Sequence, residues 1–109
     1  MNARPNQMKQ DRAYGFFRHN SGEIGKAFHD MYEKTVSNSA LDKKTHELVY
    51  IAYLAATKEY SGLELHVKGL KKMGASRAEV ESAMLCGLAP LGISLSYAYQ
   101  VAMTAYDSE

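Results

Sequence analysis

Three side chains in the middle of the chain have the chemistry to exchange protons with a bound molecule. His66 carries the best suited group, because an imidazole both gives and takes protons near neutral pH. Glu59 lies seven residues before His66, which is about two helical turns along one face, and Glu47 lies further upstream. A carboxylate in such a setting either carries protons itself or orients the imidazole. The three residues are therefore candidates for acid/base chemistry.

Each of these residues also has a simpler explanation. His66 follows Leu63 by three residues and precedes Leu70 by four, so it could be a core histidine satisfied by one hydrogen bond. Glu47 and Glu59 could be exposed acids in the first turns of two helices, where the helix dipole favours negative charge. Spacing alone leaves both interpretations open.

Other catalytic motifs fail on their spacing. His46 and Glu47 begin like a zinc-binding His-Glu-x-x-His motif, but Tyr50 stands where the second histidine belongs. The single cysteine, Cys86, lies among apolar neighbours and predicts a small, buried, inert side chain. Glu64 is expected to be solvated. The remaining histidines show no metal-ligand spacing, and neither a Gly-rich phosphate loop nor a nucleophile elbow occurs in the sequence.

Composition limits the class of protein further. A chain of 109 residues with 46% hydrophobic residues predicts one domain with a modest core. The net charge of +1 predicts no general attraction to nucleic acid or to acidic membranes. The polar N-terminus lacks the apolar segment of a secretory signal, and no apolar run approaches the roughly 20 residues of a membrane span. One cysteine agrees with a reducing compartment, so we expect a cytoplasmic protein.

Residues that cap or stop helices occur along the sequence and predict helices throughout. Asp42 is a good N-cap, Gly74 a helix stop, and Ser76 with Glu79 a capping box, whereas hairpin signals between apolar runs are missing. Asn20 with Glu23 predicts another capped helix start. The expected elements are a loose arm over 1–8, a capping-box helix from Ser76, and helices over 9–18, 22–36, 43–57, 59–73 and 93–106. The prediction is an all-α domain of six helices.

The aromatic and methionine content predicts association. These side chains exceed what the interior of a flat helical layer of this size can hold, and exposed apolar patches usually mark contact surfaces. The last helix adds small residues that allow close helix approach. The alternative is a monomer whose tyrosines expose their hydroxyls at the surface. The residues concerned are Met31, Tyr32, Tyr50, Tyr53, Tyr97, Tyr99, Met103 and Tyr106.

Three consecutive stretches resemble one known family. The stretch 41–52 contains Glu47, the stretch 59–66 ends in His66, and 67–80 continues through a Gly-Ala turn into the capping box. Their order and spacing are similar to those of the carboxymuconolactone decarboxylase and alkylhydroperoxidase superfamily, and the resemblance covers roughly residues 25–105. The redox members of this superfamily carry a Cys-x-x-Cys pair before the histidine. Here the two cysteine positions are Glu59 and Gly62.

The resemblance implies a six-helix all-α domain that assembles into a closed oligomer, a trimer or a dimer of trimers. It places a site between helices 43–57 and 59–73, with Glu47, His66 and Glu59 as its catalytic candidates. Members without the cysteine pair act on carboxylated unsaturated lactones without a metal or organic cofactor. The implied function is therefore a decarboxylase-like or isomerase-like enzyme for a small carboxylated unsaturated metabolite, whose carboxylate would be bound by an unidentified Arg or Lys.

Two other functions remain open. A non-catalytic oligomeric binding protein of the same fold would explain the loss of both cysteines as a loss of chemistry. A peroxidase or disulfide reductase would need two thiols at the site, and the chain has one cysteine elsewhere, so this function has the least support. None of the three implies a nucleic-acid or membrane partner.

Overall fold

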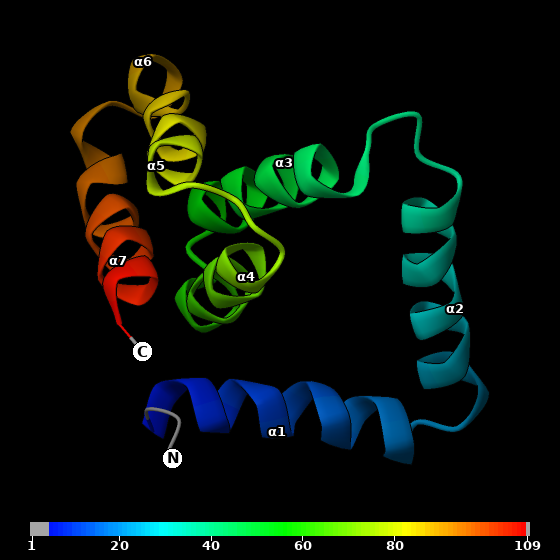
Figure 1. The fold of residues 1–109 in the computed structure, drawn as a ribbon. Coiled ribbons are helices and arrows are strands. Elements are labelled where there is room, and N and C mark those ends of the chain that lie inside the picture. Colours follow the sequence, from blue (N-terminus) through cyan, green and yellow to red (C-terminus); the bar gives the residue numbers. More distant parts are fainter. Residues whose placement is uncertain (1–4, 109) are drawn as a thin grey trace.

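The computed structural model describes residues 5–108, which form helices and contain no strand (Figure 1). The all-α prediction is confirmed. The six predicted helices correspond to α1 to α5 and α7, and two short turns, α6 and the 3-10 helix η1, fill the break that was expected around Pro90. The elements are α1 Pro5–Asn20, α2 Glu23–Ser37, α3 Lys43–Ala56, α4 Tyr60–Lys72, α5 Arg77–Leu85, α6 Leu88–Leu91, η1 Gly92–Leu95 and α7 Ser96–Asp107.

Local sequence signals explain where α3 and α5 begin and where α4 ends. The Asp42 side chain accepts a hydrogen bond from the Thr45 backbone N–H at 2.8 Å, as expected for the start of α3. Ser76 and Glu79 form the predicted reciprocal capping box at the start of α5. Gly74 has φ +98°, a backbone conformation that glycine adopts without strain, just after α4 ends. These signals placed α3, α4 and α5 within a residue or two.

Two predictions for the N-terminal region are wrong. The expected loose arm over 1–8 is helical from Pro5, because proline is well tolerated at the first position of a helix; residues 1–4 lie outside the described residues. Asn20 does not cap α2. Its side-chain amide instead donates to the Phe16 carbonyl at 2.9 Å, at the end of α1. Gly22, with φ +61°, precedes α2 without a side-chain cap.

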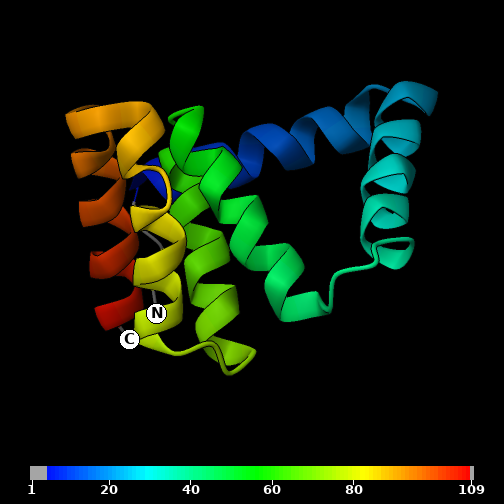
Figure 2. The ribbon, with the colours of Figure 1, turned by 90° about the horizontal axis from the view of Figure 1, so that it is seen from above.

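Helices α3, α4, α5 and α7 pack into one body, in which α4 lies against α3 and α7, and α5 against α3 and α7 (Figure 2). Buried alanines on α7 let its backbone approach its neighbours closely. On α3, Ile51 and Ala55 are buried in the core, and Leu48 packs at its edge. The largest fully buried side chains are Ile51, Leu63, Leu70, Met84, Val67 and Val80.

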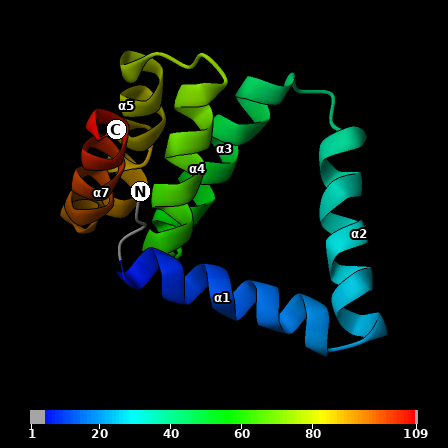
Figure 3. The same cartoon turned by 60° about the horizontal axis from the view of Figure 1, so that its bottom comes forward.

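Helices α1 and α2 form an arm on one side of this body. α1 runs along α4, and α2 then turns away and stands apart from the four packed helices (Figures 1 and 3). Gly25 makes the turn between them close, since a Cβ at this position would meet the Arg18 and Phe17 carbonyl oxygens at 2.6 and 2.9 Å. Phe28 packs edge-on against Phe17 with ring centroids 5.8 Å apart. The position of α2 is thus set mainly through α1.

The stretch Arg77–Asp107 has the length and composition of a membrane span, which is weak evidence by itself. In the fold this stretch is a hairpin of α5 and α7 rather than one straight helix. Its first and last residues meet, because the Arg77 guanidinium donates to both carboxylate oxygens of Asp107 at 2.8 and 3.0 Å. A segment whose two ends are hydrogen-bonded to each other does not cross a bilayer once.

The Arg77–Asp107 pair predicts a contribution to stability that disappears in acid. Hydrogen bonds from Arg77, and then its charge, hold the pKa of the Asp107 carboxyl below its ordinary value. The stabilisation is therefore present above the ordinary carboxyl pKa of about 4 and is lost as the pH falls through the lowered value. We expect Asp107→Asn to reduce the free energy of unfolding at pH 7 more than at pH 3.

Urea unfolding of the wild type and the variant at both pH values measures this difference. The effect is small, because both partners are solvated at the surface. Asp30→Asn is the control, since Asp30 pairs only within its own helix, with Lys26 four residues away. An equal effect of Asp107→Asn at both pH values would contradict the assignment.

Candidate functional site

Glu47 and His66 meet where α3 and α4 face each other. The His66 Nδ1 and Glu47 Oε1 atoms are 2.9 Å apart, which is within hydrogen-bond distance. Both side chains are partly buried, with 24% of His66 and 14% of Glu47 exposed. Because a carboxylate oxygen accepts, Nδ1 carries the hydrogen of this bond, and the second ring nitrogen, Nε2, is left for another partner.

The connection between the two helices sets this geometry. The chain reverses over Thr57, Lys58 and Glu59, and the Glu59 backbone N–H donates to the Leu54 carbonyl at 2.9 Å. Lys58 takes φ +63°, which is uncommon for a residue with a Cβ and marks the tight turn. The tight reversal brings the inward faces of α3 and α4 together at Glu47 and His66.

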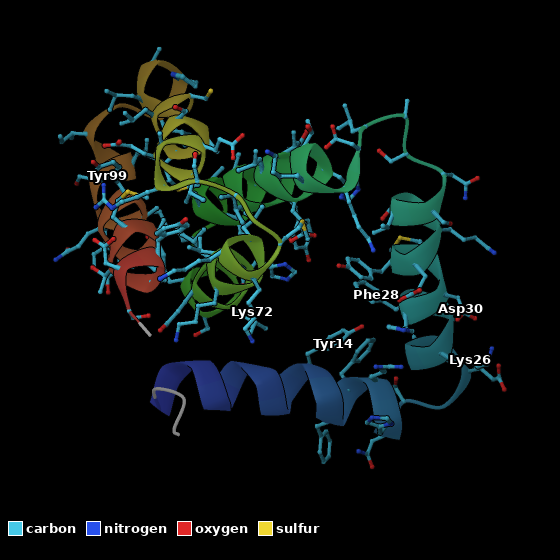
Figure 4. All side chains as sticks on the ribbon, in the orientation of Figure 1. Tyr14, Lys26, Phe28, Asp30, Lys72 and Tyr99 are labelled. Carbon is cyan, nitrogen blue, oxygen red and sulfur yellow. The ribbon has the colours of Figure 1, made fainter. Side chains whose placement is uncertain are left out.

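A cavity of about 480 Å³ opens beside His66. Its walls come from four helices, with the α1–α2 arm on one side and α3 and α4 on the other; Figure 4 labels Tyr14 and Phe28 beside this space. The lining is mainly aromatic and apolar, and its size fits a small metabolite. The lining residues are Tyr14, Phe28, His29, Tyr32, Tyr50, Leu54, Glu59, Gly62, Leu65 and His66.

Four rings follow one another along this cavity. The centroid of His66 is 4.5 Å from that of Tyr50, Tyr50 is 6.0 Å from Tyr32, and Tyr32 is 6.4 Å from His29. Burial, and then the negative charge of Glu47, raises the pKa of both Tyr32 and Tyr50. Their hydroxyls therefore stay protonated well beyond neutral pH and can act as hydrogen-bond donors.

Both positions that hold cysteines in redox members of the superfamily face the cavity. Glu59 immediately precedes α4 and is exposed at the cavity mouth, and Gly62 lies one turn further along. A Cβ at Gly62 would make ordinary contact with the Leu54 methyl groups at 3.7 Å. The structure thus brings Glu59 to the same cavity as His66, and Glu47 lies behind the imidazole.

A second cavity of about 270 Å³ lies on the other side of Glu47. Lys43 and His46 line it together with Tyr32 and Glu33. Among the side chains that the structure describes, none lining the larger cavity is Lys or Arg, so the basic residue expected for a substrate carboxylate is not found there. Within the described part of the chain, no group of three or more His, Cys, Asp or Glu is arranged to hold a metal ion.

Two predictions about individual side chains are wrong. Glu64 is only 5% exposed rather than solvated, and its carboxylate lies 3.7 Å from the Lys68 ammonium group. The reason is that α4 is a central helix, packed by α1, α3 and α7, and buries more than one face. Cys86 is exposed rather than buried. It lies just beyond the end of α5, in a groove between α3 and α5, because Val80 and Met84 occupy the inward face of that helix.

Five ring-bearing residues that line the cavity with His66 were not predicted as site residues: Tyr14, Phe28, His29, Tyr32 and Tyr50. Tyr50 could have been found, because it lies three residues after Glu47 and so shares its helix face. Tyr32 was noted only as part of the aromatic surplus. No local signal marked Tyr14 or His29, since they reach the cavity only through the turn between α1 and α2.

The comparison with known families identifies the class of protein to which this helical body, with its Glu47–His66 contact between α3 and α4, belongs. The model of the carboxymuconolactone decarboxylase family matches residues 22–103, and the chain therefore belongs to this family. The match begins at α2 and leaves out α1, which supplies Tyr14 to the cavity. Comparison with curated proteins and with solved structures gives no match.

Proposed function

We propose that the protein is a cofactor-independent acid/base enzyme, decarboxylase-like or isomerase-like, for a small carboxylated unsaturated metabolite. The observation that carries this proposal is the 2.9 Å contact between Glu47 and His66 at the wall of an aromatic cavity. The contact fixes the imidazole by Nδ1 and leaves Nε2 for the bound molecule. An oriented, partly buried imidazole is the usual group for proton transfer near neutral pH.

The proposed reaction passes through a conjugated enolate. Loss of carbon dioxide, or of a proton, from an unsaturated carbonyl compound leaves an electron pair that spreads onto the carbonyl oxygen. Nε2 of His66 returns a proton to carbon, and the Glu47 carboxylate stabilises the imidazolium form while it exists. Tyr32 and Tyr50, held protonated, are candidates to donate hydrogen bonds to the enolate oxygen. Glu59, at the mouth, is a candidate second proton carrier.

The second candidate is a binding protein of the same family without catalysis. The mainly apolar lining favours it, because aromatic walls bind a flat molecule whether or not a reaction follows. A peroxidase has less support. The only cysteine, Cys86, lies in the groove between α3 and α5 and does not line the His66 cavity.

Turnover of a carboxylated butenolide in deuterated water tests the proposal. We expect the wild type to release carbon dioxide or to incorporate deuterium at carbon, both measured by NMR, and His66→Ala to do neither. His19→Ala is the matched control, since His19 is exposed near the end of α1 and does not line the cavity. Binding without conversion by the wild type would establish the second candidate instead.

The closed oligomer, a trimer or a dimer of trimers, stays a prediction that belongs to the same proposal. Several large apolar side chains on the α5–α7 side support it, above all Ile93 at 82% and Tyr97 at 55% exposure. The single cysteine supports a cytoplasmic location as part of the proposal.

A further inference from the structure

A second histidine–carboxylate pair lies on the α2 side of the cavity. The His29 Nε2 and Glu33 Oε2 atoms are 3.5 Å apart, one helical turn from each other on α2. The other ring nitrogen, Nδ1, lies 3.4 Å from the Tyr14 hydroxyl of α1. Tyr14 and His29 both line the same cavity as His66. The three side chains form a series from the cavity to the protein surface.

The neighbours of His29 define the direction of its hydrogen bonds. The Glu33 carboxylate, 3.5 Å from Nε2, electrostatically favours the tautomer that carries its hydrogen on Nε2. In the neutral ring Nδ1 is then the acceptor, and the Tyr14 hydroxyl donates to it. The lone pairs of the Tyr14 oxygen remain available to a bound molecule. The contacts are long, as catalytic hydrogen bonds often are before a ligand binds.

We propose that Tyr14, positioned by His29 and Glu33, is a second proton-transfer group, and that the cavity converts small enols into their keto forms. This inference rests on the proposed role of His66 and specifies its substrate class. Tyr14 is the catalytic residue, because its oxygen would touch the reacting hydroxyl, whereas His29 and Glu33 are positioning residues. Glu33 is 65% exposed, so its contribution is smaller than that of His29.

The proton movements of this reaction balance. The enol O–H bond breaks, and its proton moves to the Tyr14 oxygen while the Tyr14 proton passes to His29 Nδ1. The oxygen lone pair forms the C=O bond, and the electron pair of the C=C bond takes a proton from Nε2 of protonated His66. The substrate has moved one proton from oxygen to carbon. His29 is left protonated and His66 neutral, and exchange of protons with water restores both.

The two histidines line the same cavity from two different helices. His66 lies on α4 and His29 on α2. The rings of Tyr50 and Tyr32 connect the two imidazoles in a series of ring contacts. In an enol the reacting oxygen and carbon are bonded to the same carbon atom, so one edge of the planar molecule would present its oxygen to Tyr14 and its carbon to His66, which both line this cavity. Aromatic walls favour a flat, conjugated molecule.

Ketonisation of enol phenylpyruvate, followed by its ultraviolet absorbance, tests the inference. We expect Tyr14→Phe to lower the rate acceleration by about 100-fold, the lower end of the usual effect of acid/base groups. The phenyl ring keeps the edge contact of Tyr14 with Phe28, whose centroids are 6.3 Å apart. Tyr53→Phe is the matched control, because Tyr53 is 68% exposed and does not line the cavity.

Binding of 4-nitrophenol gives a readout that does not need turnover. If Tyr14 and His29 accept a proton from a hydroxyl, the bound probe is enriched in its yellow phenolate form. Tyr14→Phe and His29→Leu should lose this enrichment. His29→Asn should not restore it, because the asparagine side-chain oxygen can accept a hydrogen bond from Tyr14 near the position of Nδ1 but cannot take up a proton.

The outcomes separate the two proposals. Unchanged ketonisation and phenolate binding in Tyr14→Phe, with loss of ketonisation in His66→Ala, would overturn the inference and leave the function of His66 intact. Loss of ketonisation in Tyr14→Phe without any loss in His66→Ala would overturn the part of the inference in which His66 protonates carbon, and butenolide turnover that also survives His66→Ala would overturn the proposed function. A wild type that does not accelerate ketonisation overturns the inference, even where butenolide turnover supports His66.

Discussion

Replacing Glu47 with glutamine is expected to lower turnover of a carboxylated butenolide by on the order of 10²- to 10⁴-fold, the usual contribution of acid/base groups. Glutamine has nearly the same shape and can still occupy the space beside His66. It removes the negative charge that stabilises the imidazolium, and its amide can present a donor where Nδ1–H needs an acceptor. The expected loss is in turnover, with the helical circular dichroism spectrum unchanged.

Glu81→Gln is the matched control for this prediction. Glu81 is also a partly buried carboxylate that accepts from a ring-bearing side chain, the Tyr99 hydroxyl at 2.6 Å, but it lies between α5 and α7. We expect its substitution to leave turnover unchanged. Full activity in Glu47→Gln would show that the Glu47–His66 contact only supports the packing of α3 on α4.

Replacing Leu63 with alanine is expected to lower the free energy of unfolding by about 2–5 kcal/mol. Leu63 is completely buried on α4, the helix that packs against three others, so the lost methyl groups leave a cavity that neighbours cannot easily fill. A domain of this kind is stable by only about 5–15 kcal/mol in total. The loss is therefore a large share of the stability, and urea unfolding measures it directly.

Leu65→Ala makes the same chemical change two residues along the same helix. Leu65 is 42% exposed, so we expect a loss of about 1 kcal/mol or less. Because Leu65 lines the cavity, this variant should weaken the binding of 4-nitrophenol, while the free energy of unfolding changes little. Equal losses of stability in both variants would contradict the central position of α4.

The helices of this fold follow largely from local chemistry in the sequence. Asp42, Gly74 and the Ser76 capping box each satisfy or release backbone groups within a few residues, so their effect is visible without tertiary contacts. The start of α2 was misjudged because Asn20 found a partner in its own helix, at the Phe16 carbonyl. A single sequence does not reveal which of two nearby partners a side chain takes.

Burial was harder to predict than secondary structure. Glu64 was expected to be solvated because the prediction gave α4 one buried face, whereas helices pack against it on several sides. Cys86 was expected to be buried because its sequence neighbours are apolar, yet α5 ends just before it. Both errors concern how many neighbours a helix has, which its own sequence does not encode.

One part of the candidate site could likewise be predicted from the sequence, and another part could not. The contact between Glu47 and His66 could be predicted, because two helices joined by a short turn must face each other. Tyr14 and His29 could not, because their position depends on the angle between α1 and α2. That angle is set at Gly22 and Gly25, outside any contact with the cavity.

The turn between α1 and α2 sets the distance between the two walls of the cavity. The Glu47–His66 pair lies within the packed body, whereas α2, on the opposite side of the cavity, is attached to that body mainly through α1. Gly25 has no room for a methyl group, so substitutions there would open or tilt that wall. Substitutions at two small residues outside the cavity can thus change the width of the cavity, and with it the position of Tyr14 and His29 relative to the Glu47–His66 pair.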